Sequence, residues 1–222
     1  MREERLRFRT VVFDLDGTLA DSSPDLAAAL NVALARLGRA PQPLAEVRTM
    51  IGYGARAMLR RGLEVTGGAD DALMAAGFRV LIDHYTAHIC DATQPYAGVD
   101  DALTALADQG IALAVCTNKP RGLAVQLIGA LGWAKRFAAV IGGDSLPVAK
   151  PDPAPLHLAI ERAGGGPAAM VGDSIIDIRT AIAAGVHSVA VSFGFADRPA
   201  DELGADRVID SFAGLIPALA EL

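Results

Sequence analysis

The chain has 222 residues, a length that allows one large domain or two small ones with a sizeable buried core. Apolar residues make up 52% and charged residues 21%, which is a globular rather than a disordered composition. The formal net charge of -6 disfavours a nucleic-acid-binding protein, because such a protein needs a basic face.

The two cysteines, Cys90 and Cys116, fit no disulfide framework, so we expect a reducing, cytoplasmic setting. No early apolar segment resembles a signal peptide, and no apolar run reaches the roughly 18 residues that a membrane-spanning helix needs. We therefore expect neither a nucleic acid nor a membrane as a partner, and either a monomer or a homodimer.

The first predicted strand covers residues 10–15 and runs directly into two carboxylates, Asp14 and Asp16. Side chains alternate along a strand, so both carboxylates can reach one site where the chain bends out of the sheet. Gly17 and Thr18 follow, and the glycine allows a tight turn with a close approach of the backbone to a ligand.

The next segment, from about residue 23 to residue 95, shows no convincing strand pattern. Its helical patterns cover residues 24–38, 43–52, 55–67 and 70–89. We predict an all-helical cap domain over residues 23–95, inserted into a core domain formed by residues 1–22 and 96–222. The insert follows the carboxyl end of the first strand, where open α/β sheets bind ligands, so it would cover the site as a lid.

Strands and helices alternate through the rest of the chain. The predicted strands cover residues 111–117, 137–143, 168–173, 188–193 and 206–210. The predicted helices cover residues 99–110, 120–132, 152–165, 175–185 and 211–222. This alternation predicts an α/β fold, a doubly wound parallel sheet with helices on both faces.

Several chemically useful residues stand where these strands end. They are Thr117 and Asn118 after the second strand of the core, Lys150 in the loop after the third, and Asp173 and Asp177 after the fourth. In a parallel sheet they gather at one edge with the first two aspartates. Clustered carboxylates need a cation, and a hard cation held by carboxylates and water is typically Mg²⁺. A metal ion and a lysine together suit a phosphoryl group, which one carboxylate can attack while another protonates the leaving oxygen.

At these residues the sequence resembles the haloacid dehalogenase superfamily, whose fold has a Rossmann-like core. The first signature of that superfamily is DxDGT, which matches Asp14-Leu15-Asp16-Gly17-Thr18 here. A threonine that closes a strand, a loop lysine and a GDxxxD-like segment follow in order. They match Thr117, Lys150 and residues 172–177. The four signatures span nearly the whole chain.

The resemblance implies a role for each matching residue. Asp14 would be the nucleophile that forms an aspartyl-phosphate, and also a Mg²⁺ ligand. Asp16 would be the general acid and base, with its backbone carbonyl on the metal, while Gly17 and Thr18 would support this loop.

The remaining matches imply contacts with the phosphoryl group and the metal. Thr117 would donate a hydrogen bond to the phosphoryl oxygens, and Asn118 beside it would bind substrate. Lys150 would offset negative charge, Asp173 would bind Mg²⁺, and Asp177 would support the water shell of the metal or orient Lys150.

Within the superfamily the chain is similar to the phosphoglycolate phosphatases, for example over residues 14–34 and 142–156. This similarity implies a Mg²⁺-dependent phosphatase of a small phosphorylated metabolite, with 2-phosphoglycolate as the first choice. A sugar phosphomutase, a phosphatase of another small phosphomonoester and a non-catalytic binding module remain as alternatives.

The cap is the only predicted segment long enough to choose between substrates. The glycines of Gly52-Tyr53-Gly54 either break a helix or form a substrate loop, and the arginines that follow either form a solvated face or bind an anion. We expect Gly52 and Arg56 to contact the carboxylate of the substrate.

Overall fold

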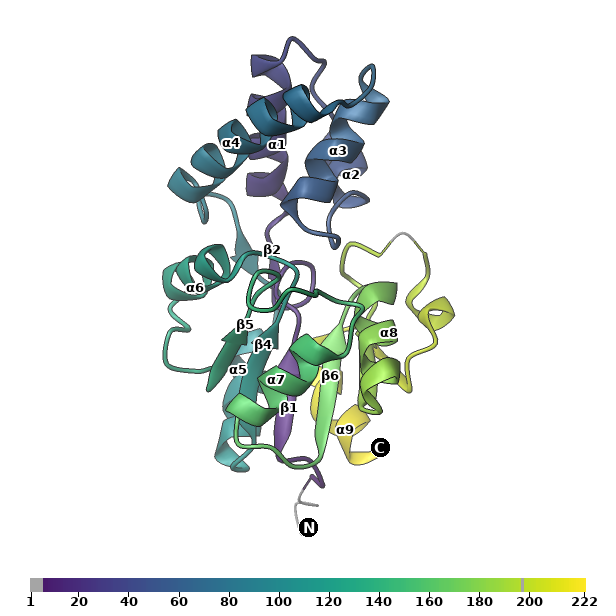
Figure 1. Ribbon diagram of the computed structural model, residues 1–222. Helices are drawn as coiled ribbons and strands as arrows, with labels where there is room; N and C mark the ends of the chain where they lie inside the picture. The colour runs from purple at the N-terminus through teal and green to yellow at the C-terminus, as the bar shows by residue number, and fades with distance from the viewer. Residues whose placement is uncertain (1–5, 197) are drawn as a thin grey trace.

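A six-stranded parallel sheet forms the centre of the larger part of the molecule (Figure 1). The computed structural model describes residues 6–196 and 198–222, so the first five residues of the predicted core lie outside the described residues. The strand order is β5-β4-β1-β6-β7-β8, and every neighbouring pair is parallel. The strands are β1 (Thr10–Phe13), β4 (Ala112–Cys116), β5 (Ala139–Ile141), β6 (Ala168–Gly172), β7 (His187–Val191) and β8 (Arg207–Ile209). The predicted parallel α/β sheet is confirmed.

Helices cover both faces of this sheet. They are α5 (Val99–Asp108), α6 (Arg121–Ala130), α7 (Ala154–Arg162), α8 (Ile175–Ala184) and α9 (Leu215–Ala220). Val12 of β1 packs in a cluster with Leu156 of α7, whereas its neighbour Val11 belongs to the cluster that contains Leu103 of α5. Because both faces are covered, β1 reads as a continuous apolar run rather than an alternating one.

The end of the chain differs from the prediction of one helix over residues 211–222. A 3₁₀ turn, η2 (Phe212–Gly214), precedes the short helix α9, and another 3₁₀ turn, η1 (Ala200–Leu203), follows β7. Gly214 and Pro217 both fall inside the predicted helix, and proline supplies no N–H donor to a helical hydrogen bond. These two residues explain the shorter helix.

The helical insert stands over the carboxyl ends of the strands in Figure 1. Its helices are α1 (Ser23–Arg36), α2 (Leu44–Arg48), α3 (Ala55–Val65) and α4 (Asp71–Ala87). Three of them are close to the predicted ranges, whereas α2 ends at Arg48 and is about half as long as the predicted helix over residues 43–52. Leu30, Leu59 and Leu81, from three different helices, are fully buried. The insert therefore has buried apolar side chains of its own.

A two-stranded antiparallel ladder, β2 (Ala20–Asp21) with β3 (Gln94–Pro95), joins the two segments that enter and leave the insert. Beside it, the buried carboxylate of Asp25 accepts hydrogen bonds from the backbone N–H groups of Ala92 and Thr93 and from the Thr93 hydroxyl. The sequence did not predict this ladder, since two residues are too few to show a strand pattern. It holds the two linkers side by side.

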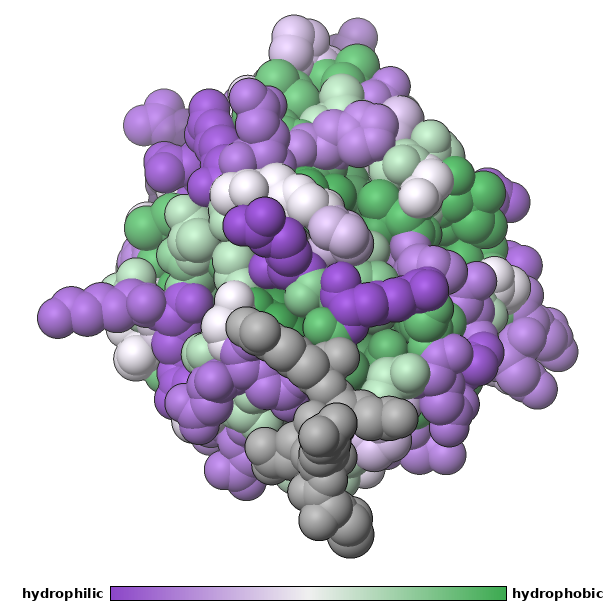
Figure 2. All heavy atoms as spheres, turned by 90° about the horizontal axis from the view of Figure 1, so that it is seen from below, coloured by the Kyte–Doolittle hydropathy of each residue, from purple (hydrophilic) through white to green (hydrophobic). Residues whose placement is uncertain are grey.

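The opposite end of the molecule lies at the amino ends of the strands. In Figure 2, which views that end, hydrophilic side chains are interspersed with apolar ones. Within the two described ranges, no helix has both the length and the apolar character that crossing a membrane requires.

Candidate active site

The loop after β1 brings the first two predicted carboxylates to the carboxyl edge of the sheet. The backbone N–H of Asp14 still donates to Val171 O of β6 at 2.9 Å, so the position of Asp14 is fixed by the ladder. Gly17 then turns the chain with φ +85°, and a Cβ atom at this position would collide with the carboxylate of Asp173. The glycine therefore permits both the turn and the close approach of this loop to the end of β6.

Three buried carboxylates form the centre of the site. Asp14, Asp173 and Asp177 each offer an oxygen, and these oxygens lie within 4.8 Å of one another. The buried Nζ of Lys150 lies 2.6 Å from Asp177 Oδ1 and 3.1 Å from Asp14 Oδ1. The structure thus brings together four of the residues that were predicted to meet at the carboxyl edge of the sheet.

Asp173 is held by its own partners at the end of β6. The hydroxyl of Thr18 donates to Asp173 Oδ1 at 2.9 Å, and the backbone N–H of Phe195 donates to Asp173 Oδ2 at 2.7 Å. Thr18 therefore connects the loop after β1 to the carboxylate that follows β6.

The charges of this cluster do not balance. Burial, together with the charges of Asp177 and Asp16, raises the pKa of Asp14 to about 6, although Lys150 lowers it. Burial, together with the charges of Asp177 and Asp14, raises the pKa of Asp173 to about 8. Lys150 lies close to Asp14 Oδ1, yet no hydrogen bond of acceptable geometry from the described residues reaches that atom. Several carboxylates around one ammonium group fit a hard divalent cation, which takes oxygen ligands.

The start of helix α8 explains why Asp177 stands four residues after Asp173. Ser174 caps this helix, and Asp177 Oδ2 accepts a hydrogen bond from the Ser174 backbone N–H at 3.1 Å, which completes a capping box. The other oxygen of Asp177 accepts from Lys150. Asp177 therefore orients the lysine while it also fixes the helix.

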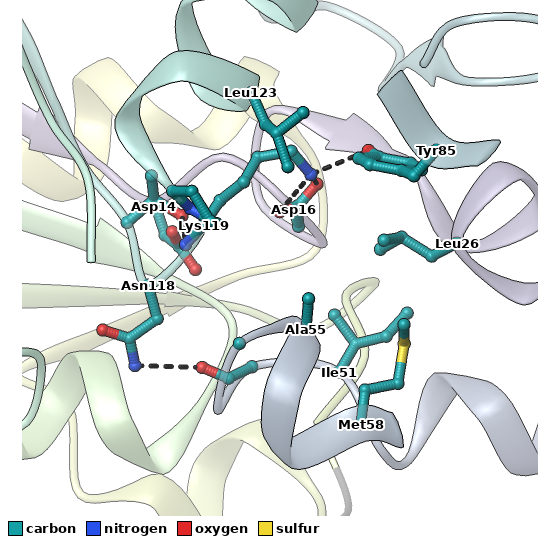
Figure 3. Close-up of a pocket in the computed structure, with 14 residues that line it drawn as sticks. Asp14, Asp16, Leu26, Ile51, Ala55, Met58, Tyr85, Asn118, Lys119 and Leu123 are labelled. Atoms are coloured by element: carbon teal, nitrogen blue, oxygen red, sulfur yellow. Dashed lines mark hydrogen bonds and ion pairs between the residues drawn. The ribbon is translucent and has the colours of Figure 1, made fainter. Parts of the chain in front are cut away.

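Asp16 lies outside the three-carboxylate cluster, and its side chain is directed to a different set of partners (Figure 3). Lys119 Nζ lies 2.9 Å from both oxygens of Asp16 and donates to the Tyr85 hydroxyl at 2.7 Å. The hydroxyl of Ser22 also donates to Asp16. The two carboxylates of the DxDGT segment thus occupy separate electrostatic environments.

Lys119 and Tyr85 are two site residues that the sequence patterns did not predict. Burial by itself would lower the pKa of the Lys119 ammonium group, but Asp16 and Tyr85 raise it overall, so the group is positively charged. One signal was available: Lys119 is one of three lysines in the chain and stands two positions beyond Thr117. Tyr85 offered none, because its helix lies far away in the sequence.

A pocket lies between the carboxyl edge of the sheet and the helical insert (Figure 3). The sheet side contributes the two aspartates of the first loop and the segment after β4, and the insert contributes mostly apolar side chains. The lining residues are Asp14, Asp16, Leu26, Ile51, Gly52, Gly54, Ala55, Met58, Tyr85, Thr117, Asn118, Lys119, Pro120 and Leu123. Residues from the two parts of the fold therefore face a common space.

Asn118 connects these two parts. Its Nδ2 donates to the carbonyl of Gly52 in the insert and to the carbonyl of Lys150 in the core, each at 3.1 Å. Gly54, with φ +87°, approaches the Asn118 carbonyl so closely that a Cβ atom would lie 3.2 Å from it. The Gly52-Tyr53-Gly54 segment thus reaches the strand end, as a substrate loop would.

Arg56 lies elsewhere on the surface of the insert. It is exposed, and its guanidinium carbon is 5.2 Å from the centre of the Phe78 ring. The guanidinium group of Arg56 therefore stacks on Phe78 within the insert, and Arg56 is not among the residues that line the pocket.

Comparison with known proteins identifies relatives over most of the chain. The family described as haloacid dehalogenase-like hydrolase matches residues 8–185. A phosphoglycolate phosphatase from Caulobacter vibrioides is 45% identical to this chain, and the match covers 91% of this chain and 87% of that protein. A phosphoglycolate phosphatase from Agrobacterium fabrum is 43% identical, and the match covers 95% of this chain and 91% of that protein. A crystal structure of a predicted phosphoglycolate phosphatase from Haemophilus somnus has a TM-score of 0.90 and 32% identity, covering 95% of this chain and 97% of its own.

Proposed function

The chain belongs to the haloacid dehalogenase-like hydrolases, and from this membership we propose that it is a Mg²⁺-dependent phosphatase that hydrolyses 2-phosphoglycolate through a phosphorylated Asp14. One observation carries the proposal: Asp14 lies in a buried cluster with Lys150, Asp173 and Asp177, and it lines a pocket together with Asp16. The relatives named as phosphoglycolate phosphatases support the choice of substrate.

The chain's own residues supply the nucleophile and the general acid and base for two successive displacements. A carboxylate oxygen of Asp14 attacks phosphorus, and the bond to the leaving oxygen breaks as that oxygen takes a proton from Asp16. Water then attacks the phosphorus of the aspartyl-phosphate and gives a proton to Asp16, which releases phosphate and restores the carboxylate of Asp14 and the protonated side chain of Asp16. Thr117 and Lys150 donate hydrogen bonds to the phosphoryl oxygens.

The donor set around Asp14 fits the metal that this chemistry needs. Asp14 and Asp173 would hold Mg²⁺ together with the backbone carbonyl of Asp16, while Asp177 stays with Lys150. The ion would neutralise the charge of the phosphoryl group and of the carboxylates around it. Lys150, which touches both Asp14 and Asp177, keeps the nucleophile in place.

We assign the choice of substrate to the helical insert, residues 23–95, acting as a cap domain on a core of residues 1–22 and 96–222. The groups of the core recognise a phosphoryl group, which all candidate substrates share. The cap supplies Leu26, Ile51 and Met58 to the pocket, so it shapes the space around the rest of the substrate. Closure would also exclude water.

The test is the release of inorganic phosphate from a panel that contains 2-phosphoglycolate, hexose phosphates and an aryl phosphate. We expect 2-phosphoglycolate to give the highest kcat/KM with Mg²⁺ and a chelator to abolish turnover. Asp14→Asn is the control for a contaminating phosphatase. Full turnover without metal would contradict the metal dependence, and a hexose phosphate as the best substrate would contradict the substrate assignment.

A further inference from the structure

Lys119 differs from the other residues that line the pocket. Among the fourteen described lining residues it is the only cation. Its side chain is 4% exposed, and Leu26, Ile51, Met58 and Leu123 face the same space. A second anionic group on a substrate cannot enter such an apolar space unpaired, because burying an unpaired charge costs several kcal/mol or more.

The ammonium group of Lys119 is fully occupied in this structure. It has three N–H donors, and two lie within hydrogen-bonding distance of the oxygens of Asp16 while the third reaches the hydroxyl of Tyr85. The ammonium also lies 4.5 Å from the centre of the Tyr85 ring. Tyr85 therefore holds the ammonium by its ring and its hydroxyl, whereas Asp16 is a partner that can be exchanged for another carboxylate.

The position of Lys119 matches the shape of a short phosphorylated acid. In the proposed function Asp16 gives a proton to the leaving oxygen, and the ammonium group of Lys119 is in direct contact with the carboxylate of Asp16. In 2-phosphoglycolate one methylene separates the leaving oxygen from the carboxylate. A substrate whose leaving oxygen is next to Asp16 therefore places its carboxylate next to Lys119.

We propose that Lys119, held by Tyr85, recognises the carboxylate of the substrate by exchanging its contact with Asp16 for one with that carboxylate. This inference rests on the proposed function. The exchange releases the side chain of Asp16, which takes up a proton from water as it leaves the ammonium group and can then give that proton to the leaving oxygen. A substrate without a carboxylate leaves Asp16 bound to the lysine. The same residue thereby selects the substrate and makes the selected substrate react faster.

This assignment differs from the expectation for Arg56. That arginine is exposed and stacks on Phe78, whereas Lys119 is buried in the pocket and contacts Asp16 directly. If Lys119 binds the carboxylate, Lys119→Met should lose the preference for a carboxylated substrate. If Arg56 binds it, Arg56→Ala should lose that preference.

The test compares two alkyl phosphates that differ at the end of the chain, 2-phosphoglycolate and 2-hydroxyethyl phosphate. In Lys119→Met, the ratio of their kcat/KM values should fall roughly 100-fold, with a rise in KM for 2-phosphoglycolate. Lys135→Met is the matched control, because Lys135 is exposed on the core and should leave the ratio unchanged. An unchanged ratio in Lys119→Met would overturn the proposal. If Arg56→Ala instead loses the preference for 2-phosphoglycolate, the arginine is the residue that binds the carboxylate.

A second measurement covers the case in which Lys119→Met fails to fold because Asp16 is left unpaired. Binding is measured by calorimetry with Mg²⁺ in the Asp14→Asn background, which blocks turnover. Adding Asp16→Asn frees the ammonium, so binding of 2-phosphoglycolate should tighten about tenfold relative to 2-hydroxyethyl phosphate. Combining Asp16→Asn with Lys119→Met removes both charges and should abolish the preference, and a preference that persists there would overturn the proposal.

The outcomes separate this inference from the proposed function. If the parent protein hydrolyses neither alkyl phosphate, the proposed function fails. If it prefers 2-phosphoglycolate and Lys119→Met keeps that preference, only the role of Lys119 fails.

Discussion

Asp14 and Asp16 are two positions apart, and the fold gives them different neighbours. Asp14 lies among other carboxylates with Lys150, and burial raises its pKa to about 6. Asp16 contacts Lys119 and Ser22 and is directed toward the pocket. One carboxylate is thus placed for attack on a phosphoryl group beside a metal, and the other for proton transfer at the leaving oxygen.

Replacing Asp16 by asparagine tests this division. An alkoxide leaving group needs a proton, whereas a nitrophenolate leaves without one. We expect Asp16→Asn to lower kcat/KM at least about 100-fold for 2-phosphoglycolate and about tenfold or less for 4-nitrophenyl phosphate. Circular dichroism checks the fold, and equal losses on both substrates would give Asp16 a structural role instead.

The sequence predicted most of the site because its residues stand at strand ends. Asp14 and Asp173 directly follow strands, Lys150 lies in the loop after β5, and Asp177 lies in the first turn of α8. The parallel sheet brings these four residues together at one edge. The contact of Lys119 with Asp16 was not predictable in this way. It depends on how the segment after β4 turns back toward the first loop, which no local pattern reports.

At the scale of elements, the linkers between core and insert are the least predictable part of the fold. The sheet and the four helices of the insert followed from long apolar patterns. The ladder of β2 and β3 did not, because its pairing joins residues far apart in the sequence. Asp25, an acidic residue in the first turn of α1, accepts hydrogen bonds from the segment that leaves the insert and so connects the two ends of the insert.

Removing the Asp25 carboxylate should therefore destabilise the protein. Asp25→Ala leaves the buried N–H groups of Ala92 and Thr93 without their acceptor, so we expect the free energy of unfolding in urea to fall by about 3 kcal/mol. Asp83→Ala is the control in the same part of the fold. Asp83 lies 3.8 Å from Arg79 in an exposed pair, and its loss should cost less than about 0.5 kcal/mol. Equal effects of the two variants would show that Asp25 does not hold the linkers.

For the whole molecule, the buried carboxylate cluster couples stability to pH and metal. Without metal, the pKa values of Asp14 and Asp173, about 6 and about 8, exceed their ordinary value of 3.8. The folded state then binds more protons than the unfolded state, so these groups favour folding at low pH. Their contribution is lost as the pH rises from about 4 to about 8.

Added Mg²⁺ should reverse this trend, because it competes with protons for the same oxygens. We expect the rise in Tm on adding Mg²⁺ to be larger at about pH 8 than at about pH 5, as measured by scanning calorimetry against a chelator blank. Asp173→Asn should remove most of the rise at the higher pH. A rise that is the same at both pH values, or that persists in Asp173→Asn, would place the metal elsewhere.

The central claim is that the phosphoryl group passes through Asp14, and chemical capture of that intermediate tests it most directly. The enzyme is mixed with 2-phosphoglycolate and Mg²⁺, quenched in acid during turnover and reduced with borohydride, which converts an aspartyl-phosphate to homoserine. Peptide mass spectrometry should find homoserine at position 14, and none without substrate or in Asp14→Asn. Homoserine at another aspartate, or phosphate release with an unmodified position 14, would contradict the account.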